Sequence, residues 1–571
     1  MHCRSIVPFL FASVTLTGAT TIRSEETRAQ LSPAAQLVGD GTTLNTAAFN
    51  AAIDRLAVAG GGTLRVPAGR YLTGTIYLKS CVTLHLDNGA VIVGSTNLAD
   101  YPRNPPPFPS ENLLYGRYAV VCAIQQHDVA ITGEGKIFGQ GSDANFSKRI
   151  LQERGLAQQD AYLNRPYGLY FHACRRVQVG NVILQNLAYR TQLYLDCDDV
   201  EVNGVTVDNR KDDCNNDGLD IDGSRNVRVV NCDVAAGDDG ITLKSSWAAC
   251  ENITINNCVI HALCNGIKFG AASRGGYKNV SISNCAIYET GVAGLAMEVV
   301  DGGVLDGVAI SNLVMSDVST AIFIRLGDRG QGWIDGQGRA APGVIRNVAI
   351  SNVTATVFAR DGTMAASITG LPDHPVENVT LSQIRITLRP GHGKVPLDNF
   401  QLTRLNAARN RVEQEFGNDI TRLKVQDVPE RPANYPEYSM FGPLPASGFF
   451  CRHVTGLTLD RIELAPETTE RRSGLALHDV HGVTVGGWRS PATPRGNPVF
   501  LFRDVTDALL TGCVAHAGTP VFLRAEGDSD HITLLGNDLS RAASTISLED
   551  GLSRRHIRIL SDPDVAPATG R

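Results

Sequence analysis

The segments VRVVNC (227–232), ITINNC (253–258) and VSISNC (280–285) repeat one short pattern along the chain. In each of them apolar side chains alternate with polar ones, which is typical of a strand with one buried face. Each segment then reaches an Asn, a residue that favours a turn. Similar segments run from VQVGNV (177–182) to ITLLGN (532–537), so the repeat extends through most of the chain.

The spacing of this repeat indicates a solenoid. A period of about 22–28 residues fits either a leucine-rich repeat or a parallel β-helix. Val and Ile dominate the repeated segments rather than regularly spaced leucines, and each period has room for three short strands. The sequence therefore predicts an all-β, single-stranded parallel β-helix with coils about 4.8 Å apart and an Asn amide ladder between equivalent turns.

The N-terminal residues show two features that precede the repeat. Residues 1–22 combine an early Arg with an apolar run and small residues, so we expect a secretory signal peptide and a secreted or periplasmic protein. Residues 35–100 are expected to form an N-terminal cap with the first strands. A helix starting at Thr46 would place Phe49, Ala52, Ile53 and Leu56 on one face and cover the open end of the core.

The remaining residues, 101–571, are interpreted as the parallel β-helix, interrupted by an insertion at about 385–450. That insertion is rich in Pro and breaks the repeat, which indicates a lid or an edge loop. No later window is long and apolar enough for a membrane span. Cys232, Cys258 and Cys285 follow Asn at the same place in the repeat, so we expect small buried residues rather than disulfide partners.

The net charge of -6, without a basic block, argues against nucleic acid as a partner. The acidic residues are instead concentrated in DDCNNDGLDIDGSRNVRVVNCDVAAGDDG (212–240). Asp238 and Asp239 follow Asp217 by nearly one period, so stacking would bring the three carboxylates to one surface spot. Because like charges repel there, this arrangement indicates a functional site rather than a set of turn-capping aspartates.

Several of these motifs resemble family 28 glycoside hydrolases, the polygalacturonase-like right-handed β-helix enzymes with a pectin-lyase-like fold. NNDGLDI (215–221) is similar to the family's Asn-Thr-Asp-Gly motif, and GDDGITLKS (237–245) is similar to its Gly-Asp-Asp motif with the following Lys of exo-acting members. The segment from GDGTTLNTAAF (39–49) to VIVGS (91–95) also resembles exo-acting and bacterial members. The resemblance covers most of residues 37–385.

The resemblance implies hydrolysis of a glycosidic bond with inversion. Asp238 would be the general acid, and Asp217 with Asp239 would hold and activate the attacking water. An inverting enzyme needs about 6.5–9.5 Å between its acid and base to admit that water. No metal or other cofactor is expected. The substrate would be a pectin-like polysaccharide or oligosaccharide.

Other positions depart from the family. Asn265 stands where a His is expected, with His261 as a possible substitute, and Ala296 to Glu298 align with the Arg-Ile-Lys motif that grips a uronate. Because a Glu would repel a uronate, we expect another pectic or rhamnose-containing glycan, cut from a chain end. The residues expected to bind substrate are Asn215, Lys244, Asn265, Lys268 and Arg325.

Two other functions remain open on the same fold. A β-eliminating polysaccharide lyase would need a cation and a base beside the uronate, and would release an unsaturated product. A non-catalytic carbohydrate-binding β-helix would bind glycans without turnover. The paired aspartates favour the hydrolase.

Overall fold

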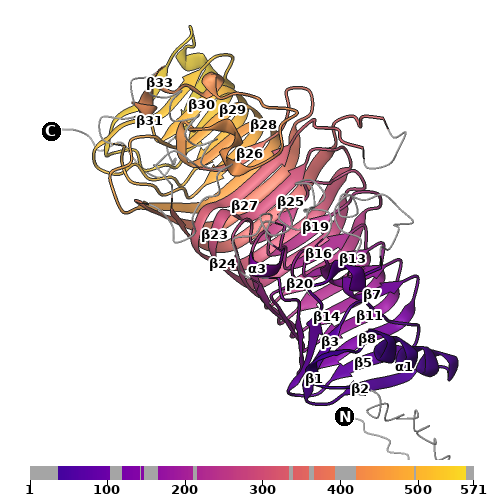
Figure 1. Ribbon diagram of the computed structural model, residues 1–571. Helices are drawn as coiled ribbons and strands as arrows, with labels where there is room; N and C mark the ends of the chain where they lie inside the picture. The colour runs from indigo at the N-terminus through magenta and orange to yellow at the C-terminus, as the bar shows by residue number, and fades with distance from the viewer. Residues whose placement is uncertain are drawn as a thin grey trace, which may run out of the picture.

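The computed structural model describes residues 37–102, 119–141, 143–146, 165–209, 215–332, 338–358, 365–391, 414, 419–493 and 497–560. The expected signal peptide and the extreme C-terminus lie outside the described residues. The described strands pair in parallel and form one long stack of coils, confirming the predicted right-handed parallel β-helix (Figure 1). The stack runs from the N-terminal coils at one end to the C-terminal coils at the other.

Short strands fall into three columns, and each coil adds one strand to each column. Column A carries the acidic motifs and contains β4 (Ile76–Tyr77), β7 (Ala119–Ile124), β10 (Tyr167–His172), β13 (Gln192–Leu195), β16 (Leu219–Asp222), β19 (Ile241–Lys244), β22 (Ile267–Phe269), β26 (Ala366–Thr369), β31 (Thr519–Glu526) and β33 (Ala542–Leu548).

Column B contains β2 (Gly62–Val66), β5 (Val82–Leu86), β8 (His127–Gly133), β11 (Arg175–Gly180), β14 (Asp198–Asn203), β17 (Arg225–Val230), β20 (Cys250–Asn256), β32 (Asp530–Leu535) and β34 (Ile557–Leu560). Column C contains β1 (Asp40–Leu44), β3 (Gly69–Thr73), β6 (Ala90–Gly94), β9 (Lys136–Phe138), β12 (Ile183–Gln185), β15 (Thr206–Asn209), β18 (Asp233–Ala236) and β21 (Val259–Ala262).

Longer strands bend through more than one column in the later coils. They are β23 (Tyr277–Val299), β24 (Val304–Leu326), β25 (Val344–Phe358), β27 (Val376–Arg389), β28 (Ala446–Pro466), β29 (Ser473–Gly486) and β30 (Phe500–Thr511). β23, for example, pairs in turn with β20, β21 and β22. A β-helix can therefore turn its corners without ending a strand.

The interior of the coils is a continuous apolar core of Val, Ile and Leu side chains. Cys232, Cys258 and Cys285 are buried free thiols in this stack, as predicted. The predicted Asn ladder is also confirmed. Asn312 donates its side-chain amide to Asn284 at 2.9 Å, and Asn352 donates to Asn312 at 2.7 Å. These Asn residues have positive φ, which Asn tolerates better than most residues.

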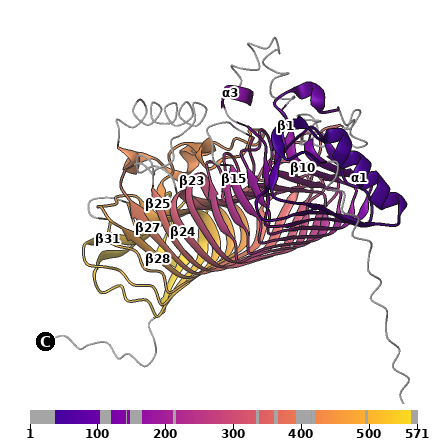
Figure 2. The ribbon, with the colours of Figure 1, turned by 60° about the horizontal axis from the view of Figure 1, so that its bottom comes forward.

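The N-terminal end is covered by α1 (Thr46–Val58), which buries Phe49, Ala52, Ile53 and Leu56 as the periodicity predicts. The prediction that Thr46 caps the helix is wrong in its detail. The N-cap residue is Asn45, and the Thr46 hydroxyl instead accepts the backbone N–H of Gly74 at 2.7 Å. Figure 2 shows α1 lying across this end of the stack. A second short helix, α3 (Asp143–Phe146), lies in a loop.

β27 ends at Arg389 and β28 begins at Ala446. Of the chain between them, residues 419–445, hereafter the cover segment, contain three short 3-10 helices, Ile420–Arg422, Val425–Asp427 and Tyr438–Phe441. Apolar residues of this segment pack on outward-facing side chains of column A, including Ala296, Phe323 and Phe450. The cover segment therefore buries the outer face of column A in the coils that follow β22.

No helix among the described residues is both long and apolar enough to cross a membrane.

Candidate active site

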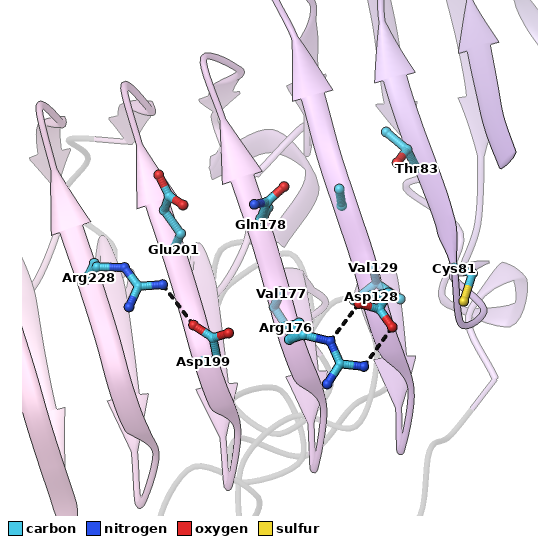
Figure 3. Close-up of a pocket in the computed structure, with 11 residues that line it drawn as sticks. Cys81, Thr83, Asp128, Val129, Arg176, Val177, Gln178, Asp199, Glu201 and Arg228 are labelled. Carbon is cyan, nitrogen blue, oxygen red and sulfur yellow. Dashed lines mark hydrogen bonds and ion pairs between the residues drawn. The ribbon is translucent and has the colours of Figure 1, made fainter. Parts of the chain in front are cut away.

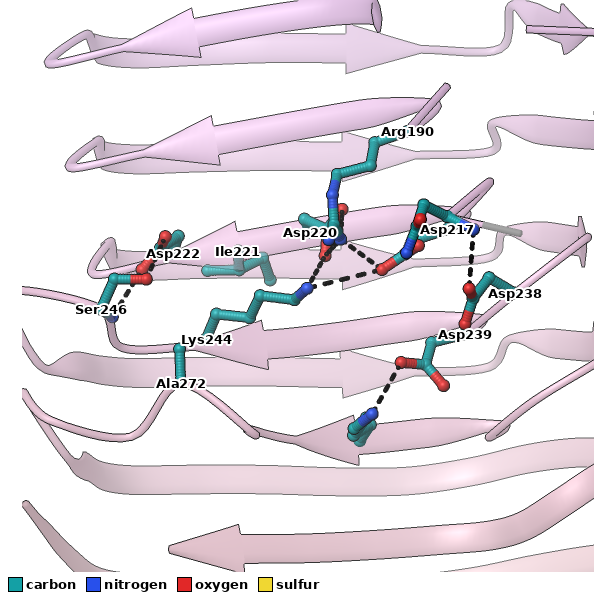
Figure 4. Close-up of polar contacts among 12 residues, drawn as sticks. Arg190, Asp217, Asp220, Ile221, Asp222, Asp238, Asp239, Lys244, Ser246 and Ala272 are labelled. Atoms are coloured by element: carbon teal, nitrogen blue, oxygen red, sulfur yellow. Dashed lines mark hydrogen bonds and ion pairs between the residues drawn. The ribbon is translucent and has the colours of Figure 1, made fainter. Parts of the chain in front are cut away.

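The three predicted carboxylates lie in turns that lead into column A. Asp217 precedes β16, and Asp238 and Asp239 precede β19. β16 and β19 pair with Leu219 beside Ile241, so residues two positions earlier, Asp217 and Asp239, are stacked one coil apart. Figure 4 shows the three side chains grouped at the same end of these strands. The structure thus brings together the acids that the repeat length placed one period apart.

Glycines set how closely these turns approach. Gly218 follows Asp217, and Gly240 follows Asp239. A Cβ atom at Gly218 would lie 2.6 Å from the carbonyl oxygen of Gly240, and one at Gly240 would lie 2.5 Å from that of Gly266. Only glycine allows this spacing, which explains why the acids occur in Asp-Gly sequences. The backbone N–H of Gly218 donates to the Asp239 carbonyl at 2.9 Å and continues the stack.

Asp217 is buried against two cations. Its Oδ2 atom pairs with Nη1 of Arg190 and lies 3.6 Å from Nζ of Lys244. The same two cations contact Asp220, at 3.0 Å and 3.6 Å respectively. Burial, followed in size by the opposing effects of Arg190 and Asp217, raises the pKa of Asp220 to about 7. Two carboxylates and two cations therefore form one compact buried network (Figure 4).

Asp239 is held by a different set of partners. Its Oδ1 accepts the backbone N–H and the side-chain amide of Asn265, at 3.0 and 2.7 Å, and its Oδ2 lies 3.1 Å from Nζ of Lys268. Burial alone would raise the pKa of Asp239, but the Lys268 ammonium and the Asn265 hydrogen bonds outweigh it and leave that pKa lowered. Asp239 is therefore an ionised carboxylate with a fixed orientation.

Asp238 differs from both neighbours. It is partly exposed and accepts the backbone N–H of Asn215 at 2.7 Å, and among the described residues no cation forms an ion pair with it. Burial of the carboxyl group, together with the negative charges of Asp217 and Asp239, raises the pKa of Asp238 to about 7. At neutral pH this group therefore retains a substantial share of its proton, as a general acid must.

The end of the site toward the later coils is formed by Lys268, Glu298 and Tyr435. Lys268 Nζ donates to the Tyr435 hydroxyl at 3.3 Å and lies 4.0 Å from Glu298 Oε2. Glu298 is buried, and burial followed by the effect of nearby charges raises its pKa to about 8. Tyr435 belongs to the cover segment, so this segment touches the site directly.

Of the expected substrate-binding residues, the structure gathers Asn215, Lys244, Asn265 and Lys268 around the acids, but not Arg325. Arg325 is fully buried, and its guanidinium donates to the carbonyl oxygens of Gly370, Glu430 and Arg431 at 3.1, 2.9 and 3.2 Å. It also lies over the ring of Phe441. This placement makes Arg325 a clamp for the cover segment, because its donors face backbone carbonyls rather than the acids.

His261 does not replace the missing family His. It lies on β21 in column C, stacked on Tyr288 and 3.2 Å from Glu289. Sequence reasoning missed Arg190, Asp220 and Tyr435. Asp220 stands in the acidic stretch itself and alternates with buried residues of β16, which was a usable signal. Arg190 and Tyr435 belong to no recognisable motif.

Two groups of side chains have the residue types of a metal site. The carboxylates of Asp238 and Asp239 and the thiol of Cys264 lie within 4.8 Å of one another, as do the ligand atoms of Cys81, His127 and Asp128. In each group one carboxylate is already neutralised, Asp239 by Lys268 and Asp128 by Arg176. The second group borders a charged patch on the outer face of column B, where Figure 3 shows the Arg176–Asp128 and Arg228–Asp199 pairs.

The fold and the site together define a β-helical glycosidase, and comparison with known proteins identifies its family. Residues 60–404 match the model of glycosyl hydrolases family 28, and the chain belongs to this family. The chain is 27% identical to a protein of Vitis vinifera named "Probable polygalacturonase", over 63% of this chain and 74% of that one. It is 26% identical to an exo-poly-alpha-D-galacturonosidase of Dickeya chrysanthemi, over 55% of this chain and 60% of that one.

Among solved structures, a hyperthermoactive exopolygalacturonase from Thermotoga maritima has the same fold. The TM-score is 0.52 at 24% identity, and the match covers 62% of this chain and 85% of that one. The repeat therefore continues in this chain beyond the matched family region, through β28 to β34.

Proposed function

We propose that this glycosidase hydrolyses a glycosidic bond in a pectin-like polysaccharide or oligosaccharide, with inversion and from a chain end. The observation that carries the proposal is the unequal environment of three adjacent carboxylates. Asp217 and Asp239 each face a cation, whereas Asp238 pairs with none among the described residues and has a pKa raised to about 7. One proton donor beside two ionised carboxylates is the set of groups that inverting hydrolysis requires.

In this mechanism Asp238 gives its proton to the glycosidic oxygen as the bond to the leaving group breaks. Asp217 and Asp239 orient a water molecule on the other face of the sugar and accept its proton as it attacks. The partial exposure of Asp238 suits a group that must reach a leaving group. The ionised carboxylates also favour the positive charge that develops on the sugar ring.

The cover segment supports cleavage from a chain end. It buries the outward-facing side chains of column A just beyond Lys268, and Tyr435 stands against Lys268 itself. A polysaccharide that lies along column A would meet this segment and could not extend past the acids in that direction. The Dickeya relative is named as an exo-acting enzyme, in keeping with this proposal.

Glu298 bears on which pectic sugar is bound. It stands close to Lys268 with its Oε2 atom without a hydrogen-bond partner, and Lys268 is already paired with Asp239. A uronate placed against Glu298 would therefore meet a carboxyl group rather than an unengaged cation. This favours a neutral sugar of a pectic glycan, such as one containing rhamnose, at that position. The N-terminal sequence further supports a secreted or periplasmic enzyme.

Product analysis tests the proposal. The protein would be incubated with a panel of galacturonides and rhamnogalacturonan fragments, and products would be followed by chromatography and by proton NMR of the first anomer released. We expect release of short products from one end, with the anomeric configuration inverted. A retained configuration, an unsaturated product absorbing in the ultraviolet, or no turnover across the panel would each contradict it.

A further inference from the structure

Arg190 holds two acidic residues at once in the centre of the site. It lies immediately before β13, one coil earlier than Asp217, and its side chain is only 4% exposed. Its Nη1 atom pairs with Oδ2 of Asp217 and lies 3.0 Å from both carboxylate oxygens of Asp220. The guanidinium carbon lies 5.6 Å from the centre of the Tyr189 ring, which supports it from the side.

The charges around Asp217 come from four elements. Arg190 precedes β13, Asp220 lies on β16, Lys244 lies on β19, and Asp238 and Asp239 lie in the turn before β19. Three of these groups are acids, and Tyr189 adds a phenol that faces Asp217 across Arg190. Of the two cations, Arg190 is in direct contact, whereas Lys244 stays 3.6 Å away. Arg190 is therefore the principal counter-charge of Asp217.

We propose that Arg190 is a positioning residue that keeps Asp217 ionised and correctly oriented, and so fixes Asp217 as a base and leaves Asp238 as the acid. This inference rests on the proposed function, in which Asp217 accepts a proton from water. An opposite charge in contact favours the ionised form of a carboxylate, and it does so most strongly in a buried site. A guanidinium can also span two carboxylates with fixed geometry, which an ammonium cannot do.

The same contacts explain why the two cations are divided unevenly over the site. Arg190 and Lys244 both serve Asp217 and Asp220, and Lys268 serves Asp239. If Arg190 were lost, Asp217 and Asp220 would share only Lys244, and a proton would bind to this pair at higher pH. The water would then have lost one of the two carboxylates that accept its proton.

The test is the pH dependence of kcat/KM for the wild type, Arg190→Met and Arg190→Lys, on the pectic fragment that the wild type turns over. The acidic limb of this profile reports the base of the free enzyme. We expect Arg190→Met to move that limb upward by about one pH unit or more, with at least a tenfold loss at pH 5 and a smaller loss near pH 7. Arg190→Lys should restore most of the limb, because it keeps the charge. Arg176→Met, at the exposed Arg176–Asp128 pair, is the matched control and should leave the profile unchanged.

A uniform loss of activity with an unmoved acidic limb in Arg190→Met would overturn the inference, since that is the signature of a merely structural role. If Arg190→Met does not fold, Arg190→Met combined with Asp220→Asn removes one buried negative charge as well and serves in its place. Infrared difference spectra between each protein and its Asp217→Asn version follow the ionisation of Asp217 without any substrate. They should show Asp217 protonating at higher pH when Arg190 is absent, and an unchanged titration would overturn the inference even if no glycan is cleaved. Absence of turnover by the wild type would instead count against the proposed function.

Discussion

The backbone N–H of Asn215 donates to Oδ2 of Asp238 at 2.7 Å and joins the turn before β16 to the turn before β19. The bond fixes one oxygen of Asp238 and lowers its pKa, but burial and the charges of Asp217 and Asp239 have the larger effect. The net result is a carboxyl group that is oriented by one hydrogen bond and yet retains its proton near neutral pH. The following predictions depend on this balance.

Asp238→Asn should lower kcat by about 10²–10⁴-fold, because a positioned proton donor contributes on that order. The amide has nearly the same shape, so folding and substrate binding should be retained. Turnover of the wild type and the variant on one pectic fragment measures the effect. Asp199→Asn, which removes an exposed carboxylate paired with Arg228, is the control and should be fully active. Near-normal turnover in Asp238→Asn would refute the assignment of the acid.

The wild-type rate should fall as the pH rises through about 7, because the pKa of Asp238 is raised to about 7 and the acid must be protonated to act. Lys268 lowers that pKa, so Lys268→Met should move the basic limb to higher pH, besides reducing the rate through the loss of the Asp239 partner. The measurement is kcat/KM between pH 4 and 9. Lys278→Met, at an exposed pair with Glu251, should not move the limb. A basic limb that stays in place in Lys268→Met would contradict this electrostatic account.

Arg325→Met should destabilise the protein by about 1–3 kcal/mol, because it leaves buried carbonyl oxygens of the cover segment and of Gly370 without their donor. Denaturant unfolding measures this loss. KM should change little, since Arg325 contacts the cover segment rather than the acids. Arg346→Met, at an exposed pair with Asp306, should change stability by less than about 1 kcal/mol. A large rise in KM at unchanged stability would instead assign Arg325 to substrate binding.

Glu298→Gln should make stability less dependent on pH. The pKa of Glu298 is raised from its ordinary 4.5 to about 8 in the folded protein, so the folded state binds a proton that the unfolded state releases between these values. The folded state therefore loses stability as the pH rises from about 4.5 through 8, at about 1.4 kcal/mol per unit of pKa difference as an upper bound. Without this group the decline should flatten. Thermal unfolding at pH 5 and pH 8 compares the two proteins, and an equal decline in both would show that Glu298 does not titrate as inferred.

The sequence by itself determined the β-helix, because Val and Ile alternate in every period and an Asn recurs at the same turn. Any fold that buries all these faces must stack one coil on the next, and that stacking places Asp217 one layer from Asp239. The same regularity identified the helix α1 and the buried cysteines. Local pattern and global fold agree here, so periodicity was a sufficient guide.

Only the tertiary structure decided which charged groups surround the acids. Arg190 comes from the preceding coil, and Tyr435 comes from the cover segment 167 residues after Lys268. No period links either residue to the acidic motifs. The structure also assigned Arg325 to the cover segment, although its place on column A made it a candidate for the site. The reason is physical: the repeat sets the distance between coils, whereas the direction of long side chains and the path of an insertion depend on the packing that each of them finds.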